Sequence, residues 1–265
     1  MDINGKSAIV TGGASGIGAA AARQLAAKGA KVLVAYLNAE KGEALANEIG
    51  GAFASVDVTK TDQIQAAVEQ AVAMAPLWAL VNSAGIGWAQ RTIGRDGEFG
   101  SAHDINAFRK VIDINLIGTF DAIRLAATAM SKNEPNEHGE RGSICNMASV
   151  AAFDGQIGQA SYSASKGGVV GMTLPVARDL SAAGVRVNTI APGLIDTPMG
   201  VDHAAELMGV DRDEYAELRA GMVPLGHQGS AWDVARAALF LASDDAAFIT
   251  GVCLPVDGGQ SARIG

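Results

Sequence analysis

The chain has 265 residues, of which 49% are hydrophobic, and this is enough to bury one large core within a single domain. Its formal net charge of −8 argues against nucleic acid or an anionic membrane surface as the main partner. No apolar run approaches the roughly 20 residues that cross a bilayer and the N-terminus has no signal-peptide pattern, so we expect no membrane partner and a cytoplasmic location.

Short apolar runs alternate with amphipathic, alanine-rich segments along the chain. Strands are expected at Ser7–Val10, Lys31–Tyr36, Ala52–Val56, Ala79–Asn82, Ser143–Met147, Arg186–Ile190 and Val252–Val256. Helices are expected at Ile17–Lys28, Glu40–Ile49, Asp62–Ala75, Asn106–Ala129, Gln159–Leu180, within Asp202–Gly221, and at Ala231–Ala242. Apolar strands separated by helix-length segments predict βαβ units. The fold class is therefore α/β, a Rossmann-like doubly wound parallel sheet of about seven strands with helices on both faces.

Two long segments fall outside this alternation. Ile86–Asp104 is a long, glycine-containing loop where a connection of about two to six residues is the norm. Leu194–Ser230 follows the sixth strand and is expected to be a substrate lid. Ligands of doubly wound sheets bind outside the carboxyl ends of the strands. Both segments leave that edge, so both are expected to border a site for a small-molecule substrate.

The first strand leads into a glycine-rich turn, Thr11-Gly-Gly-Ala-Ser-Gly-Ile-Gly18, that opens onto a helix. Glycines let the backbone approach a diphosphate, and the helix N-terminus offers free N–H donors and a positive dipole. Plain strand–helix packing is the alternative interpretation. The candidate cofactor residues of this turn are Gly12, Ser15, Gly16, Ile17 and Gly18.

A second pattern carries chemistry. Tyr162 lies four residues before Lys166, so both side chains lie on one face of a helix, where an ammonium can stabilise a phenolate. Ser149 lies 13 residues before Tyr162, between a strand and that helix, and can donate a hydrogen bond to a substrate oxygen. A chance Tyr–Lys pair on an exposed helix face is the alternative.

With Asn82-Ser-Ala-Gly85, Asn115 and Pro192-Gly193 in the same order, the whole chain resembles the short-chain dehydrogenase/reductases. The stretch 133–180 is similar to the branch of multifunctional 3-hydroxyacyl-CoA dehydrogenases that also oxidise hydroxysteroids. The resemblance implies hydride transfer between NAD and a secondary alcohol, with Tyr162 as base beside Ser149 and Lys166. It also implies that Asn115 holds a water that links Lys166 to solvent. An inert polar helix residue is the alternative for Asn115.

The second strand bears on the choice of cofactor. An acid that would bind the adenosine ribose of NAD is replaced there by Tyr36, either an ordinary strand-end aromatic or a side chain packed on the adenosine. A cation at position 15 or 37 would bind the 2′-phosphate of NADP, but these positions hold Ser15 and Leu37 rather than Arg or Lys. A buried phosphate without a cation is expensive to desolvate. NAD is therefore favoured over NADP.

The resemblance implies further cofactor contacts. Asp57 and Val58 are expected to contact adenine, although Asp57 could instead cap the next helix. Asn82 is expected to tie strands together. Ser83, Ala84 and Gly85 are expected to lie against the cofactor. Tyr162 and Lys166 also belong to the cofactor site, and the nicotinamide side is assigned to Pro192, Gly193, Ile195 and Thr197, the last with simple turn chemistry as the alternative.

Other chemistries are poorly supported. The four histidines form no metal-spaced pair, so no metal site is expected, and no G-x-S-x-G motif indicates a hydrolase. The alternatives that remain are an NADPH-dependent 3-oxoacyl-thioester reductase, a hydroxysteroid dehydrogenase, and a dinucleotide-sensing or scaffold protein without activity. The last would be expected to lack Tyr162, Lys166 or Ser149, and none is missing.

The sequences of two predicted helices suggest self-association. Helices Asn106–Ala129 and Gln159–Leu180 look too apolar or small-faced to be solvated all round, and the resemblance implies that they form a dimer seam within a homotetramer.

Between Val201 and Gly221 the lid carries six acids against two arginines, which is a poor surface for the phosphates of CoA. A solvated helix face is the favoured interpretation. Arg91 or Arg95 on the other long loop would then guide CoA.

Overall fold

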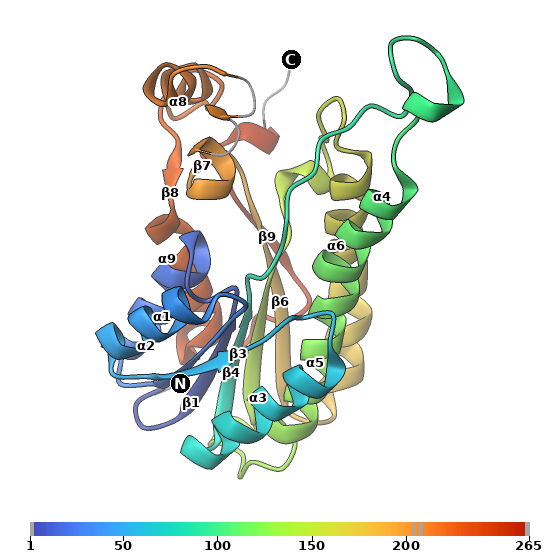
Figure 1. Ribbon diagram of the computed structural model, residues 1–265. Coiled ribbons are helices and arrows are strands. Elements are labelled where there is room, and N and C mark those ends of the chain that lie inside the picture. Colours follow the sequence, from blue (N-terminus) through green and yellow to red (C-terminus); the bar gives the residue numbers. More distant parts are fainter. Residues whose placement is uncertain (1–2, 203–204, 207–208, 263–265) are drawn as a thin grey trace.

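The chain forms three layers, a parallel sheet between two layers of helices (Figure 1). The computed structural model describes residues 3–202, 205–206 and 209–262. Within these residues the strand order is β3-β2-β1-β4-β5-β6-β9. All neighbouring strands are parallel. The strands are β1 (Ser7–Thr11), β2 (Lys31–Tyr36), β3 (Ala52–Ser55), β4 (Leu77–Asn82), β5 (Gly142–Met147), β6 (Val185–Pro192) and β9 (Cys253–Val256), with a separate pair β7 (Ile195–Asp196) and β8 (Gly229–Ser230).

Helices cover both faces of the sheet, as expected for a doubly wound fold (Figure 1). They are α1 (Gly16–Ala27), α2 (Ala39–Ile49), α3 (Thr61–Met74), α4 (Ile105–Ile112), α5 (Gly118–Met130), α6 (Ala160–Ser181), α8 (Arg212–Ala220) and α9 (Ala231–Ala242). A π-helical turn at Asp113–Ile117 joins α4 to α5. None of the helices in the described ranges is both long and apolar enough to cross a membrane.

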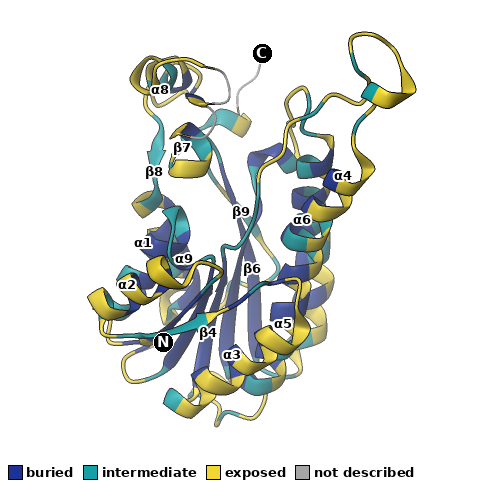
Figure 2. Ribbon diagram, viewed as in Figure 1, coloured by how far each residue is buried: buried dark blue, intermediate teal, exposed yellow. Residues whose placement is uncertain are grey.

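The sheet separates two hydrophobic cores because successive strand side chains point to opposite faces. In β1, Ala8 and Val10 belong to the core under α1, α2 and α9, whereas Ile9 belongs to the core under α3, α5 and α6. Figure 2 shows the sheet as a buried layer between helices whose outer faces are exposed. The α/β architecture predicted from the alternation of apolar runs is therefore confirmed.

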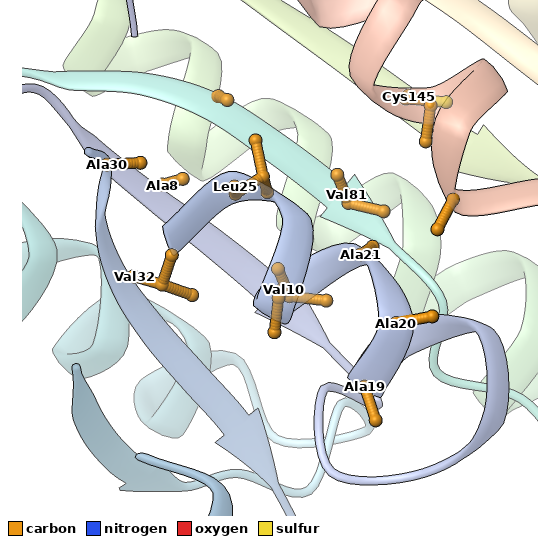
Figure 3. Packing of buried hydrophobic residues seen from close by; sticks show 14 of the residues in the cluster. Ala8, Val10, Ala19, Ala20, Ala21, Leu25, Ala30, Val32, Val81 and Cys145 are labelled. Carbon is orange, nitrogen blue, oxygen red and sulfur yellow. The ribbon is translucent and has the colours of Figure 1, made fainter. Parts of the chain in front are cut away.

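The first helix lies close to the sheet because its buried face is made of small residues. Ala20, Ala21 and Ala22 are each at most 3% exposed, and Leu25 fills the space at the end of the same face. Figure 3 shows Ala20 and Ala21 with Leu25 over the strand residues Val10 and Val32. This packing fixes the direction in which the helix N-terminus points, and the glycine-rich turn precedes that N-terminus.

The chain leaves β1 toward β2 and β3 on one side of the sheet, and it returns as β4 on the other side of β1. In doubly wound sheets such a reversal of strand order opens a crevice at the carboxyl ends of the two central strands. Here that point brings the glycine-rich turn after β1 beside the segment after β4, and the Ser83 amide donates to the Thr11 carbonyl at 3.1 Å.

The expected helix Asn106–Ala129 is present as α4 and α5, and the sequence did not predict the π-helical turn between them. The π-helical turn at Asp113–Ile117 inserts an extra residue between α4 and α5. Its cause is tertiary, since Asn115 at its centre bonds to the backbone of Ile86, 29 residues earlier. Such turns are rare and occur mostly at functional sites.

A buried ion pair links β6 to the loop before β5. Arg186 Nε donates to Glu140 Oε1 at 2.7 Å, and each side chain is only 7% exposed. The guanidinium also donates to the carbonyl oxygens of Leu241 and Ser243 at the end of α9. The pair thus connects β6, the loop before β5 and the end of α9.

We expect Glu140→Ala to lower the free energy of unfolding by about 3–5 kcal/mol, because it leaves a buried guanidinium without its counter-ion. Glu48→Ala is the matched control, because Glu48 pairs with Arg23 at 2.6 Å but both side chains are well exposed. Its cost should be much smaller, because water and salt screen an exposed ion pair. Urea denaturation at equal protein concentration measures both values, and equal losses would contradict the assignment.

Candidate active site

The glycine-rich turn lies directly against the segment after β4. Gly12 has φ +65°, and a Cβ built on it would lie 2.7 Å from the Ala84 amide nitrogen. Only glycine allows both the left-handed backbone and this close approach. Ser15 begins α1 without a side-chain capping hydrogen bond. The N–H groups of the first helical turn are therefore available to a diphosphate, and the residues present fit a dinucleotide.

Asn82 joins the carboxyl ends of three strands, as the sequence predicted. Its Oδ1 accepts from the Thr11 hydroxyl at 3.3 Å, and its Nδ2 donates to Asn146 Oδ1 at 2.9 Å. The Thr11 hydroxyl oxygen also accepts from the amides of Ser83 and Ala84 at 3.2 and 3.3 Å. Thr11 had been assigned no role of its own, although it is the first residue of the glycine motif.

The residues predicted to contact the adenosine are Tyr36, Asp57 and Val58. Tyr36 ends β2, is half-buried, and packs against the core under α1. Asp57 Oδ1 accepts from the amide and the hydroxyl of Thr59 at 2.9 and 2.8 Å, and these bonds hold the pKa of Asp57 below its usual range. The residue before α3 is Lys60, so the alternative in which Asp57 caps this helix was wrong. Both bonds use Oδ1, which leaves Oδ2 for an adenine amino group.

The structure brings Tyr162, Lys166 and Ser149 together. Tyr162 and Lys166 lie on α6, with the Lys166 ammonium 5.7 Å from the centre of the Tyr162 ring. Ser149 follows β5, accepts from the Ala151 amide at 3.1 Å, and shares a side-chain hydrogen bond with Tyr162. A hydroxyl, a phenol and an amine thus converge beside the carboxyl end of β5, which is the geometry that the spacing predicted.

The charges in this cluster differ from expectation. Burial raises the pKa of Tyr162, and the bond from Ser149 only partly offsets this. Burial also lowers the pKa of Lys166 to about 8. Lys166 Nζ donates to the Met147 carbonyl oxygen at 2.8 Å and does not hold down the pKa of Tyr162 as we had expected. Desolvation outweighs the attraction between the two groups in the protein alone.

Asn115 is not an inert helix residue, so that alternative was wrong. It is fully buried, accepts from the Ile86 amide at 2.8 Å, and donates to the Ile86 carbonyl at 2.9 Å and to Ser165 Oγ at 3.1 Å. Ser165 in turn donates to the Tyr162 carbonyl at 2.7 Å. Sequence reasoning missed Ser165, although it stands inside the Tyr-Ser-Ala-Ser-Lys motif.

A gap beside Gly85 bears on the water expected at Asn115. A Cβ on Gly85 would lie 3.2 Å from Asn115 Oδ1 and 3.6 Å from Lys166 Nζ. The absence of that side chain leaves room between these two polar atoms. Asn115 Oδ1 has one lone pair free after its bond to Ile86, so it can accept from a water placed there. The water-holding role of Asn115 stays a prediction.

The segment after β6 folds over the glycine turn. Pro192 ends β6, and Gly193 packs so tightly that a Cβ there would lie 2.6 Å from the Asp257 Cβ. Ile195 is buried in β7. Thr197 lies 3.6 Å from the position of a Cβ on Gly16, and its Oγ1 accepts from the Gly200 amide at 3.1 Å. Thr197 therefore has the turn role that we considered, and its contact with nicotinamide stays a prediction.

The segment predicted to be a lid, 194–230, reaches the long loop that follows β4. Met199 Cγ lies 3.9 Å from the position of a Cβ on Gly87. The helix α8 is capped by Asp211, which accepts from the amides of Asp213 and Glu214. Residues 203–204 and 207–208 of the lid lie outside the described residues. No group of three or more metal-ligating side chains occurs among the residues that are described.

Comparisons with known proteins agree with this geometry. The model of a family described as "Enoyl-(Acyl carrier protein) reductase" matches residues 12–261. The chain is 53% identical to 3-hydroxyacyl-CoA dehydrogenase type-2 of Drosophila melanogaster, over 72% of this chain and 75% of that protein. It is 36% identical to the 3-oxoacyl-[acyl-carrier-protein] reductase FabG of Thermotoga maritima, over 98% and 99%. The structure of 3-hydroxyacyl-CoA dehydrogenase type-2 from Mycobacterium avium superposes with a TM-score of 0.87 at 42% identity, covering 97% and 96% of the two chains.

We expect Tyr162→Phe to lower kcat for oxidation of a secondary alcohol at least 100-fold, because the hydroxyl is the proposed base in the transition state. The dissociation constant of NAD should change little. Lys166→Ala should damage both quantities, since the resemblance also gives this lysine a grip on the nicotinamide ribose. Steady-state kinetics and NAD titration test this, and a Tyr162→Phe variant with more than about a tenth of kcat would show that the base is wrong.

The lowered pKa of Lys166 has a consequence for stability. Burial lowers the pKa of Lys166 from 10.5 to about 8, so between these two pH values the folded chain binds fewer protons at Lys166 than the unfolded chain. The contribution of this group to stability therefore rises with pH in that window.

We expect Lys166→Met to raise the free energy of unfolding at pH 7 by roughly 2 kcal/mol, because it removes a buried ammonium at the cost of one hydrogen bond. The gain should shrink as the pH rises from 8 toward 10.5. Urea denaturation at pH 7, 9 and 10 measures it. A loss of stability at pH 7 would mean that the charged lysine is not costly to bury.

Proposed function

This chain belongs to the short-chain dehydrogenase/reductase family and is an oxidoreductase acting on CH–OH donors, and we propose that it transfers hydride between NAD and the 3-hydroxyl carbon of a 3-hydroxyacyl-CoA. The observation that carries the proposal is the convergence of Ser149, Tyr162 and Lys166 beside a glycine turn with a free helix N-terminus. A sensor or scaffold protein would not need a buried amine and phenol, whose desolvation lowers the stability of the folded chain.

In the proposed mechanism Ser149 donates a hydrogen bond to the substrate oxygen and positions it against Tyr162. The Tyr162 hydroxyl, as phenolate, takes the proton of the substrate alcohol. The glycine turn and the N-terminus of α1 would hold NAD, which would supply the hydride acceptor and a positive charge that favours the phenolate. Lys166 adds a second positive charge when protonated, and Asn115 with Ser165 keeps the tyrosine helix in place. In the reverse direction Tyr162 returns the proton to the ketone.

The preference for NAD rests on the residues at the end of β2. Leu37 is 69% exposed and Tyr36 is half-buried. Neither side chain carries a positive charge that could pair with a 2′-phosphate. Ser15, which precedes α1, is also uncharged. An NADP phosphate would lose water there without gaining a charged partner. The missing acid at Tyr36 makes the expected preference modest.

The substrate proposal rests on the resemblance over 133–180 and on the two relatives named for 3-hydroxyacyl-CoA. The FabG relative keeps an NADPH-dependent 3-oxoacyl-thioester reductase as the alternative. A hydroxysteroid dehydrogenase is the other alternative, favoured by apolar side chains such as Met199 at the lid.

We expect turnover of 3-hydroxybutyryl-CoA with NAD, a lower kcat/KM with NADP, and weaker activity on a hydroxysteroid. The absorbance of the reduced nicotinamide follows each reaction. Activity confined to steroids or small free alcohols would contradict the substrate while leaving the dehydrogenase assignment in place. A higher kcat/KM with NADP would contradict the cofactor preference.

We also propose a homotetramer built through α4, α5 and α6. Apolar side chains are exposed along these helices, including Ile117 at 54% and Phe120 at 46%. Gly171 on α6 is open, because a Cβ built on it would meet no atom within 4 Å. Small residues on an exposed helix face permit the close approach of a second helix.

Sedimentation velocity at micromolar concentration should therefore report a tetramer. Gly171→Arg should reduce it to a smaller species, since the new side chain has space in the single chain but none in the proposed seam. Gly100→Arg is the matched control, because Gly100 is equally open but lies on the long loop, away from α6. A wild-type protein that sediments only as monomer would refute the assembly.

A further inference from the structure

Two arginines lie on one face of the lid helix α8 and differ in their partners. Arg212 and Arg219 are seven residues apart, so their side chains lie on the same side of the helix. Arg212 is exposed and donates to Asp196 at 2.7 Å and to Asp202 at 3.1 Å, which fastens the start of α8 to β7. Arg219 is only 8% exposed, and in the part of the chain that the structure describes its Nε has no hydrogen-bond partner and no carboxylate lies within ion-pair distance.

A buried arginine without a counter-ion is costly, because the guanidinium remains charged at every physiological pH. The Arg219 guanidinium lies over the ring of Tyr215, with Cζ 5.6 Å from the ring centre. Such a contact recovers part of the lost hydration but uses none of the five N–H donors. The side chain is thus prepared for an anionic partner.

The position of Arg219 points to a ligand of the active site. Its Nη2 lies 3.5 Å from the position of a Cβ on Gly200, and Thr197 Oγ1 lies 3.1 Å from that same point. Thr197 in turn packs against the glycine turn at Gly16. The guanidinium therefore lies beside the segment that packs against the glycine turn. The helix α8, which carries Arg219, lies near β7 (Figure 1).

We propose that Arg219 binds a phosphate oxyanion of a ligand enclosed by the lid, and that it is a specificity-determining residue of this enzyme. The inference rests on the proposed function for one of two sources of that phosphate, the CoA part of the substrate. The diphosphate of the dinucleotide is the other source. Arginine suits either one, because its planar fork can donate two parallel hydrogen bonds to a phosphate.

This assignment changes the meaning of the acidic lid. Asp213, Glu214 and Glu217 are all exposed on α8, whereas Arg219 is buried on the other side. The net negative charge of the lid is thus directed to solvent, and the side facing the protein presents a cation. The acidic composition does not argue against a phosphate ligand, and Arg91 or Arg95 is not required to explain one.

The test compares two substrates with the same acyl group. Arg219→Met should raise KM for 3-hydroxybutyryl-CoA about 10- to 100-fold. It should leave KM for the phosphate-free 3-hydroxybutyryl-N-acetylcysteamine within about two-fold of wild type. Arg219→Lys should recover much of the loss because it keeps the charge. Arg236→Met is the matched control, since Arg236 is an exposed arginine on α9 and should change neither KM.

Three further measurements make the outcomes distinct. Titration of NAD identifies the source, because an affinity loss for NAD with equal effects on both thioesters assigns the phosphate to the dinucleotide. Titration of free coenzyme A separates the proposals, since binding that depends on Arg219 without thioester turnover would refute the proposed substrate but not Arg219. Thermal unfolding of the ligand-free variants excludes a structural role, because removing an unpaired buried cation should raise Tm. A lower Tm of Arg219→Met with unchanged affinities for all these ligands would overturn the inference.

Discussion

The site depends on one constraint, the hydrogen bonds that hold the carboxyl ends of β1, β4 and β5 in register. Asn82 accepts from Thr11 and donates to Asn146, and the Thr11 hydroxyl oxygen accepts two amides of the following segment. These bonds form where the strand order reverses, so they place the glycine turn beside the loop that leads to Asn115. Together with the backbone ladders of β1, β4 and β5, they fix the helix N-terminus for the cofactor relative to the helix that carries Tyr162.

The catalytic cluster is built from groups that are unfavourable in the folded protein alone. Burial raises the pKa of Tyr162 and lowers that of Lys166 to about 8, so neither group is charged as readily as in water. Active sites commonly carry such groups, because the reaction needs them near the proton and away from solvent. Their positions are held by hydrogen bonds to backbone carbonyl oxygens, from Lys166 to Met147 and from Ser165 to Tyr162. Rigidity comes from those bonds rather than from an ion pair between the two catalytic residues.

Much of the fold was predictable from the sequence because buried parallel strands are continuous apolar runs. The bounds of β2 and α9 agree with the sequence prediction to the residue, and the convergence of Ser149, Tyr162 and Lys166 followed from their spacing. The π-helical turn was not predictable, because Asp113–Ile117 has ordinary helical composition and the turn depends on a bond to Ile86. The inward Arg219 was missed for a related reason. Helical periodicity predicts which residues share a face, but only the tertiary fold decides whether that face meets solvent.

The chain has a formal net charge of −8, yet it buries two basic side chains, Lys166 in the catalytic cluster and Arg219, which we propose as a phosphate ligand. Neither forms an ion pair with a carboxylate within the described residues, while the exposed Arg212 is paired with several. Burying an unpaired cation lowers stability, and an anionic ligand that reaches it restores the lost interactions. The overall acidity therefore repels anions from most of the surface, and the two cations mark the places where a phosphate or a developing alkoxide gains most. Selectivity for anionic ligands then follows from contrast between surface and site rather than from a basic surface.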